Sequence, residues 1–259
     1  MSEARRRPGI PLRTVPPNAL TALALCAGLT GVRFAIAGEW ERAALSVVVA
    51  GVLDGLDGRL ARLLKGQSRF GEQLDSLSDV IAFGVAPALV MFLWSLKDVP
   101  RYGWVFALAL AVCMALRLAR FNSQIDAADQ PRKSAGFLTG VPAPAAAGLA
   151  MLPLYVWLWS GIPEVRSPWL VAPWLAFVAF LAVSNLATYS WGSIRLRPSV
   201  RLGALAGVAL LGAALLSDPF VTLTAVSVVY LVLILFAVRS YGRVKRRRAA
   251  EALRTAQAE

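Results

Sequence analysis

The sequence contains no histidine and two cysteines among its 259 residues. Because there is no imidazole to act as a base or a metal ligand, carboxylates must carry any acid–base chemistry. Cys26 and Cys113 both fall in apolar stretches without the spacing of a metal site, and we interpret them as packing residues. The candidate functional groups are therefore oxygen atoms.

Acidic residues are also few, since 15 Asp and Glu stand against 27 Lys and Arg and give a formal net charge of +12. Such an excess can indicate nucleic-acid binding, but that function needs a soluble basic face, and long apolar stretches leave none. The chain is 58% hydrophobic, whereas soluble domains are about half apolar. The composition predicts a membrane protein with no nucleic-acid partner, whose basic residues favour the anionic cytoplasmic leaflet.

Apolar stretches long enough to cross a bilayer recur along the chain. A spanning helix needs about 20 mostly apolar residues. The candidate spans are roughly 18–37, 43–64, 74–96, 102–122, 140–160, 168–188, 200–216 and 218–238. We therefore expect an all-α, polytopic membrane helix bundle of about eight transmembrane helices, with both termini on one side. The basic start leads through Pro16-Pro17 into an ordinary span, so no cleavable signal peptide is predicted.

The basic residues predict which side faces the cytoplasm. Most lie in the N-terminal segment, the second-to-third, fourth-to-fifth and sixth-to-seventh connections, and the C-terminal tail. Those expected on the other side are Arg33, Arg42, Lys97, Arg101 and Arg166. The positive-inside rule makes the richer side cytoplasmic, which predicts a multi-pass protein of the inner (cytoplasmic) membrane with cytoplasmic termini and active site. The tail should leave the membrane as a short basic helix that anchors the topology.

Four aspartates stand between two apolar stretches, in DGLDGRLARLLKGQSRFGEQLDSLSD (54–79). On a helix Asp54 and Asp57 share one face, and so do Asp75 and Asp79. Two helices joined by a short turn are antiparallel neighbours, so the four carboxylates are predicted to converge. Small residues on the same stripes leave room for a ligand or for close helix packing.

Converging carboxylates at low dielectric repel one another and require positive charge. Arg59 and Arg62 can neutralise part of the charge, but they cannot surround four acids from two helices. Oxygen ligands suit Mg²⁺ or Mn²⁺, and four carboxylates can hold two such ions. Two ions can clamp phosphate oxygens and activate an attacking oxygen, so the cluster predicts a metal–phosphate site.

Eight residues of this stretch stand at fixed spacing, in the pattern D-x₂-D-G-x₂-A-R-x₈-G-x₃-D-x₃-D. They are Asp54, Asp57, Gly58, Ala61, Arg62, Gly71, Asp75 and Asp79. The pattern resembles the signature of the CDP-alcohol phosphatidyltransferases at every defined position. The resemblance implies a six-helix membrane core, divalent metals, a homodimer, and release of CMP when an alcohol attacks the phosphate nearer the lipid.

The resemblance also implies roles for these positions. Metal-binding residues would be Asp54, Asp57 and Asp75, with Asp79 both in the metal site and acting as the general base. The implied nucleotide-binding positions are Asp54, Asp57, Gly58, Ala61, Arg62, Gly71 and Asp75.

Further stretches at 17–33, 78–90, 117–122 and 136–148 look like the integral-membrane bacterial phosphatidylserine synthases within this family. That likeness implies CDP-diacylglycerol and L-serine as substrates, with phosphatidylserine and CMP as products. Asn185 and Ala187 depart from the arginine and proline expected there. The expected division is a basic cytoplasmic segment (1–17), the family core (18–190), two additional transmembrane helices (191–240) and a basic cytoplasmic tail (241–259).

Two arginines, Arg117 and Arg120, stand three residues apart near the cytoplasmic end of the fourth expected span. Either guanidinium can fork onto a carboxylate such as that of serine, or onto a phosphate. Both also fit the role of positive-inside or headgroup anchors, and the sequence leaves these readings open. Arg132 and Lys133 are weaker candidates.

Three other functions are compared with this prediction. The same chemistry with glycerol-3-phosphate, inositol or choline as the acceptor is the nearest alternative. A cation transporter is a remote one, because transporters often show related halves, whereas here the acids gather within 26 residues at one membrane face. A scaffold without catalysis gives no reason for the spacing of the aspartates.

Overall fold

The computed structural model describes the chain except for residues 1–11, 100, 126–136, 185–186, 190–200 and 257–259. Apart from turns and short loops, the described residues form helices and two three-residue strands, which pair antiparallel with Leu138 opposite Thr188. The α-helices and strands are α1 (Val15–Ile36), α2 (Trp40–Leu63), α3 (Arg69–Asp79), α4 (Ala86–Met91), α5 (Gly103–Ile125), β1 (Phe137–Thr139), α6 (Ala143–Ala150), α7 (Leu152–Ser160), α8 (Pro168–Val183), β2 (Ala187–Tyr189), α9 (Arg201–Ser217) and α10 (Pro219–Ala256). The shorter helical elements are the 3₁₀ turns η1 (Leu12–Thr14) and η5 (Pro163–Arg166), and the π-helical stretches η2 (Val80–Val85) and η3 (Phe92–Leu96). The expected all-α fold is confirmed.

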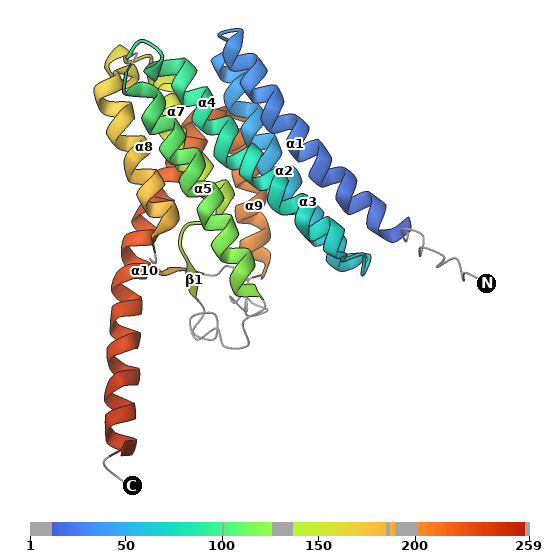
Figure 1. Ribbon diagram of the computed structural model, residues 1–259, viewed down its shortest axis with the longest axis vertical. Coiled ribbons are helices and arrows are strands. Elements are labelled where there is room, and N and C mark those ends of the chain that lie inside the picture. Colours follow the sequence, from blue (N-terminus) through green and yellow to red (C-terminus); the bar gives the residue numbers. More distant parts are fainter. Residues whose placement is uncertain (1–11, 100, 126–136, 185–186, 190–200, 257–259) are drawn as a thin grey trace, which may run out of the picture.

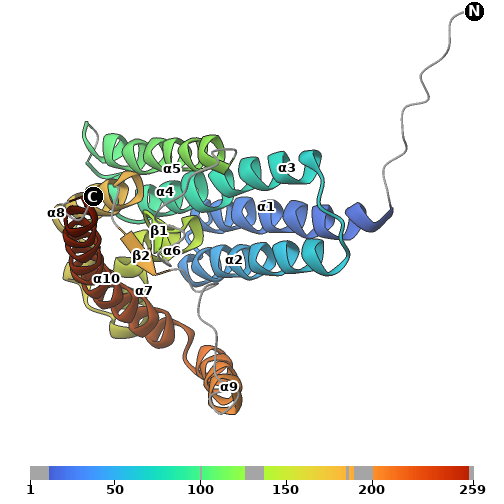
Figure 2. The ribbon, with the colours of Figure 1, turned by 90° about the horizontal axis from the view of Figure 1, so that it is seen from below.

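Helices α1 and α2 form an antiparallel hairpin that runs alongside α3 (Figures 1 and 2). The chain reverses at Gly38, whose φ of +75° favours glycine. A Cβ atom at Gly31 of α1 would lie 3.1 Å from the carbonyl oxygen of Ala43 in α2, so the two backbones approach closely here. Small residues of this kind hold helices together where lipid supplies no hydrophobic drive.

The third helical segment runs without a break from Arg69 to Leu96 and contains two π-helical stretches. It passes from α3 through η2, α4 and η3. Ser68 caps its start, because its Oγ accepts a hydrogen bond of 3.1 Å from the Gly71 amide. A Cβ atom at Gly28 of α1 would lie 2.8 Å from the Cα of Ala82 in η2. This close crossing fixes α1 against the segment that carries two of the aspartates.

Helices α5 to α8 complete the bundle around this segment (Figure 1). Gly84 of η2 faces α5, where a Cβ atom would lie 3.1 Å from the Cβ of Met114. Helices α6 and α7 form one apolar pair that bends by 45° at Met151, just before Pro153. The core they enclose is buried and rich in alanine, with Trp94 and Tyr155 among its largest side chains.

Judged by length and composition, fewer helices of the structure qualify as membrane spans than the sequence predicts. Among the described residues, four helices are long and apolar enough to cross a bilayer, and the bent α6–α7 pair makes a fifth. They are Leu12–Ile36, Arg69–Leu96, Gly103–Ser123, Pro219–Ala237 and Ala143–Ser160. The expected count of eight is thus not confirmed, since α8 and the apolar stretch Leu205–Ser217 are short, and the second half of α2 carries the charged residues of the motif.

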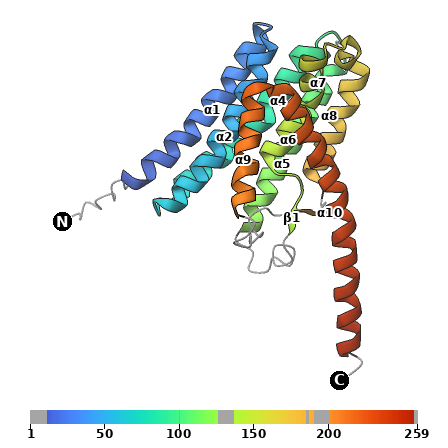
Figure 3. The ribbon, with the colours of Figure 1, turned by 180° about the vertical axis from the view of Figure 1, so that it is seen from behind.

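The last two helices lie at the edge of the bundle. Helix α9 stands apart from the other helices in Figure 2, and Leu202, Leu210 and Leu216 on it are exposed. Helix α10 crosses in front of α6 and α7 in Figure 3, which shows the molecule from behind, and continues well beyond the bundle. The start of α1, the α2–α3 connection and the end of α10 all lie at one end of the molecule (Figure 1).

Candidate active site

Four aspartates from two helices meet at the end of the bundle where α2 finishes and α3 begins. Asp54 and Asp57 lie in the second half of α2, and Asp75 and Asp79 lie in the second half of α3. Helix α1 packs against both α2 and α3 and so sets their relative position. The chain runs down α2 and back up α3, as the short connection predicts.

Three of the aspartates form a group with the geometry of a metal site. One carboxylate oxygen from each of Asp54, Asp57 and Asp75 lies within 4.8 Å of the other two. Asp57 is buried and its two neighbours are half-buried. Only carboxylate oxygens are offered, which is the donor set that Mg²⁺ and Mn²⁺ prefer.

Asp79 lies at the edge of this group. Its carboxyl group is within hydrogen-bonding reach of the Asp54 carboxyl. Two carboxyl groups at that separation need a proton or a cation between them. The structure therefore brings all four predicted residues together, with Asp79 reaching the group through Asp54.

Basic side chains do not neutralise the aspartates directly. Within the described parts of the chain, the four carboxylates form no ion pair with lysine or arginine, and the ion pair that is formed joins Arg42 and Glu39 at the far end of α2. The cluster is thus a concentration of negative charge that lacks a protein counter-ion in contact. This arrangement fits divalent cations, as the sequence analysis expects.

Helix α1 supplies a polar contact that sequence reasoning missed. The Thr21 hydroxyl lies 2.6 Å from Oδ2 of Asp57 and donates a hydrogen bond to it. Thr21 is itself buried, and its backbone carbonyl accepts a hydrogen bond of 3.2 Å from the Ser78 hydroxyl on α3. Thr21 therefore links α1 to both aspartate-bearing helices, and its place in the quoted stretch 17–33 was the available signal.

The predicted nucleotide-binding positions have different surroundings. Gly58 is exposed, and a Cβ atom there would meet nothing within 4 Å. Ala61 is half-buried and Arg62 is exposed at the end of α2. Gly71 instead packs against α1, since a Cβ atom there would lie 2.7 Å from Oδ1 of Asn18. Open space for a ligand is thus present beside Gly58, whereas Gly71 permits helix packing.

The two candidate arginines of α5 are placed differently. Arg117 is half-buried and lies within electrostatic range of Asp79 and of Tyr230 on α10. Arg120 donates a hydrogen bond of 2.8 Å to the carbonyl oxygen of Val183, and another of 3.4 Å to that of Ser184. Arg120 thereby satisfies carbonyl groups at the C-terminal end of α8. Arg117 is the one that faces the aspartates.

Some predicted positions lie outside the described residues. These are Arg132, Lys133 and Asn185. The backbone of Ala187 belongs to β2.

Comparison with known proteins agrees with this geometry. A family model described as CDP-alcohol phosphatidyltransferase matches residues 14–188, and one described as CDP-alcohol phosphatidyltransferase 2 matches residues 199–234. The first match covers more than half of the chain. The chain belongs to the CDP-alcohol phosphatidyltransferase family.

Curated relatives in this family share one name, CDP-diacylglycerol–serine O-phosphatidyltransferase. The Mycobacterium tuberculosis protein is 37% identical over 93% of this chain and 83% of its own length. The Mycobacterium leprae protein is 36% identical over 92% of this chain and 79% of its own length. A Helicobacter pylori relative is 35% identical over 66% of this chain and 70% of its own length. A member of the CDP-alcohol phosphatidyltransferase family is a transferase, and the apolar helices indicate that this one is a membrane protein.

Proposed function

We propose that this phosphatidyltransferase moves a phosphatidyl group from CDP-diacylglycerol to L-serine, giving phosphatidylserine and CMP. The observation that carries the proposal is the cluster of Asp54, Asp57 and Asp75 beside Asp79 at one end of a bundle of apolar helices. The name shared by relatives that match over most of the chain supports serine as the acceptor.

The carboxylates of Asp54, Asp57 and Asp75 would hold Mg²⁺ or Mn²⁺, and with Asp79 the site would take two ions. When bound, such ions supply positive charge to phosphate oxygens and to the leaving group. The buried Thr21 hydroxyl would keep Asp57 in the orientation it has here, because it donates to one carboxylate oxygen and leaves the other available.

Asp79 would act as the general base. It takes the proton from the serine hydroxyl, whose oxygen then forms a bond to the phosphorus nearer the diacylglycerol. The bond from that phosphorus to the bridging oxygen of the pyrophosphate breaks, and its electron pair leaves with CMP. Asp79 suits this role because it lies at the edge of the aspartate group, on the side of Arg117.

The nucleotide would lie along the exposed end of α2. Gly58 leaves space for a ligand against the backbone, and Arg62 brings a positive charge to the same end of the helix. Ala61 belongs to the same face as Gly58. Gly71 would contribute indirectly, by letting α3 approach Asn18 of α1.

The cellular setting follows from the charge distribution. We place the site at the cytoplasmic face of the inner membrane, where CDP-diacylglycerol keeps its acyl chains in the bilayer while its headgroup enters from the cytoplasm. The chain would be divided as the sequence analysis expects, with the family core at 18–190, and would form a homodimer.

The test is an acceptor assay with the purified full-length protein. Labelled L-serine, glycerol-3-phosphate, inositol and choline are each offered with CDP-diacylglycerol, and labelled lipid and CMP are measured together. We expect phosphatidylserine and CMP in equal amounts, lost in excess EDTA and restored by Mg²⁺ or Mn²⁺. Product from glycerol-3-phosphate with none from serine would contradict the proposed acceptor, and full activity in EDTA would contradict the metal site.

A further inference from the structure

Two buried polar atoms without hydrogen-bond partners belong to groups within electrostatic range of each other, and one of these groups is also within range of Asp79. Among the described residues, buried side-chain nitrogen or oxygen atoms without a partner are found on Trp94, Arg117 and Tyr230. Nε of Arg117 and the hydroxyl oxygen of Tyr230 belong to groups in mutual electrostatic range. Buried polar atoms are almost always hydrogen-bonded in native proteins, so such a pair calls for a partner.

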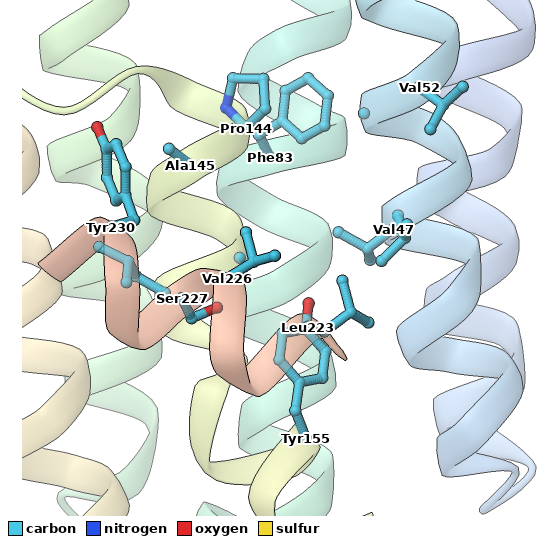
Figure 4. A pocket seen from close by; sticks show the side chains of 14 residues that line it. Val47, Val52, Phe83, Pro144, Ala145, Tyr155, Leu223, Val226, Ser227 and Tyr230 are labelled. Atoms are coloured by element: carbon cyan, nitrogen blue, oxygen red, sulfur yellow. The ribbon is translucent and has the colours of Figure 1, made fainter. Parts of the chain in front are cut away.

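Tyr230 also lines a cavity of about 310 Å³ that is otherwise almost wholly apolar. Tyr230 lines this cavity together with Val52, which precedes Asp54 by two residues on α2. In Figure 4 Tyr230 and Val52 stand on opposite sides of the view, with Pro144 and Phe83 between them, and Tyr155 lies below, beside Leu223. Arg117 approaches from α5 on the side of Asp79. Helices α5 and α10 thus bring two polar groups to the edge of the site.

We infer that Arg117 and Tyr230 together bind the carboxylate of the amino-acid acceptor while Asp79 receives the proton of its hydroxyl. This inference rests on the proposed function. Both groups can donate hydrogen bonds, and a carboxylate accepts from both. In serine the hydroxyl and the carboxylate are carried by adjacent carbons, so a hydroxyl at Asp79 places the carboxylate within reach of a group beside Asp79.

Charge supports the same assignment. A carboxylate that approaches four aspartates is repelled unless a cation meets it, and Arg117 forms no ion pair in the described part of the chain that would consume its charge. Arg120 is less suited, because its guanidinium is engaged with the last carbonyl groups of α8. Tyr230 stands on α10, outside the aspartate signature and within residues 199–234, which match the second family model.

The test compares Tyr230→Phe with Tyr155→Phe in the full-length protein. Tyr155 is a second tyrosine that lines the same cavity and is buried, so its variant controls for loss of a buried hydroxyl. A hydrogen bond to a charged group corresponds to roughly a tenfold change or more in affinity. We expect Tyr230→Phe to raise the KM for serine about tenfold and to leave the KM for CDP-diacylglycerol unchanged, while Tyr155→Phe changes neither.

L-serinamide separates carboxylate binding from other effects, because it keeps the hydroxyl and the amine but carries a neutral amide. The wild-type enzyme should prefer serine to serinamide, and Tyr230→Phe should reduce that preference. Arg117→Lys should also reduce the preference for serine over serinamide. In the double variant, this preference should fall by less than the two single reductions combined, because both residues act on the same carboxylate. An unchanged preference in Tyr230→Phe, or an equal rise in the KM for CDP-diacylglycerol, would overturn the inference.

Two outcomes separate this inference from the proposed function. If the wild-type enzyme forms phosphatidylserine but uses serinamide as well as serine, the carboxylate site is wrong and the function stands, even if Tyr230→Phe fails to fold. If the wild-type enzyme forms no phosphatidylserine, the proposed function and the inference about the carboxylate site are both wrong.

Discussion

Asp79 differs from the other three aspartates in its surroundings, although all four belong to one signature. It lies outside the group of three carboxylates with metal-site geometry, within reach of Asp54 and in the field of Arg117. A base must release its proton again after each turnover, so a position at the edge of a metal site suits it better than a position inside. The structure thus offers a physical reason for one of the four to differ in role.

The first prediction concerns Asp79→Asn, which keeps the shape of the side chain but removes its basicity. We expect kcat to fall by about 100-fold or more, as general-base catalysis commonly contributes that much, with CDP-diacylglycerol binding retained. Turnover by CMP release and binding by calorimetry would be measured on the same preparation. Glu72→Gln, on the exposed face of the same helix, is the control and should behave as wild type. Normal turnover in Asp79→Asn would remove Asp79 from the role of base.

The second prediction concerns Thr21→Val, which removes the hydroxyl that donates to Asp57. Loss of a group that orients a metal ligand typically weakens metal affinity by about 10-fold to 100-fold. We therefore expect a higher Mn²⁺ concentration for half-maximal activity, with nearly normal activity at saturating metal. Thr30→Val is the control, since the Thr30 hydroxyl donates to the carbonyl of Cys26 in its own helix. An unchanged Mn²⁺ titration for Thr21→Val would show that Thr21 does not orient Asp57.

At the scale of residues, the site residues that could be predicted from the sequence are those whose spacing along one helix places them on a common face. Asp54 and Asp57 share a helix face, and so do Asp75 and Asp79, so their convergence followed from helix periodicity and a short connection. Thr21 and Tyr230 could not be predicted in this way. Thr21 contacts Asp57, and Tyr230 comes into electrostatic range of Arg117, from helices distant in sequence, so only the packing of α1 and α10 brings them there.

At the scale of elements, the crossing of α1 with the third helical segment decides where the aspartates lie. The bounds of most long helices follow the apolar stretches, because length and hydropathy set them, whereas α10 continues past the expected span to Ala256, through the basic tail that was expected to be a short helix. The π-helical stretches η2 and η3 and the bend between α6 and α7 were not predicted. They depend on local fit, such as the contact of Gly28 with Ala82, which no apolar pattern records.

The third prediction tests that crossing with Gly28→Ala. A Cβ atom at this position would lie 2.8 Å from the backbone Cα of Ala82, so the helices must move apart. Overpacking of this kind costs about 1–3 kcal/mol, and we expect a lower Tm in detergent together with reduced activity. Gly212→Ala in α9 is the matched control, because a Cβ atom there meets nothing within 4 Å. A Tm as high as that of the control would mean that the crossing is looser than described.

At the scale of the whole molecule, charged side chains make different contacts at its two ends. At the end opposite the aspartates, Arg42 pairs with Glu39, and Arg166 lies over the rings of Trp40 and Trp157 at 5.7 and 5.8 Å. Arg166 also donates a hydrogen bond of 2.7 Å to the carbonyl of Trp94. Arg42 and Arg166 are therefore held by protein contacts, which accounts for their presence on the side expected to be poor in positive charge.

The last prediction tests the orientation that this charge distribution implies. In a chain whose Cys26 and Cys113 are replaced by serine, a single cysteine is placed at Gln67, in the α2–α3 connection, or at Ile162, which follows α7 and is exposed. The α2–α3 connection and the connection from α7 to α8 lie at opposite ends of the bundle (Figure 1). Because the end that holds the aspartates should face the cytoplasm, a membrane-impermeant maleimide should label Ile162→Cys in intact cells and Gln67→Cys only after permeabilisation. The reverse pattern would place the active site on the outer face, where a nucleotide-linked lipid made in the cytoplasm could not reach it without crossing the membrane.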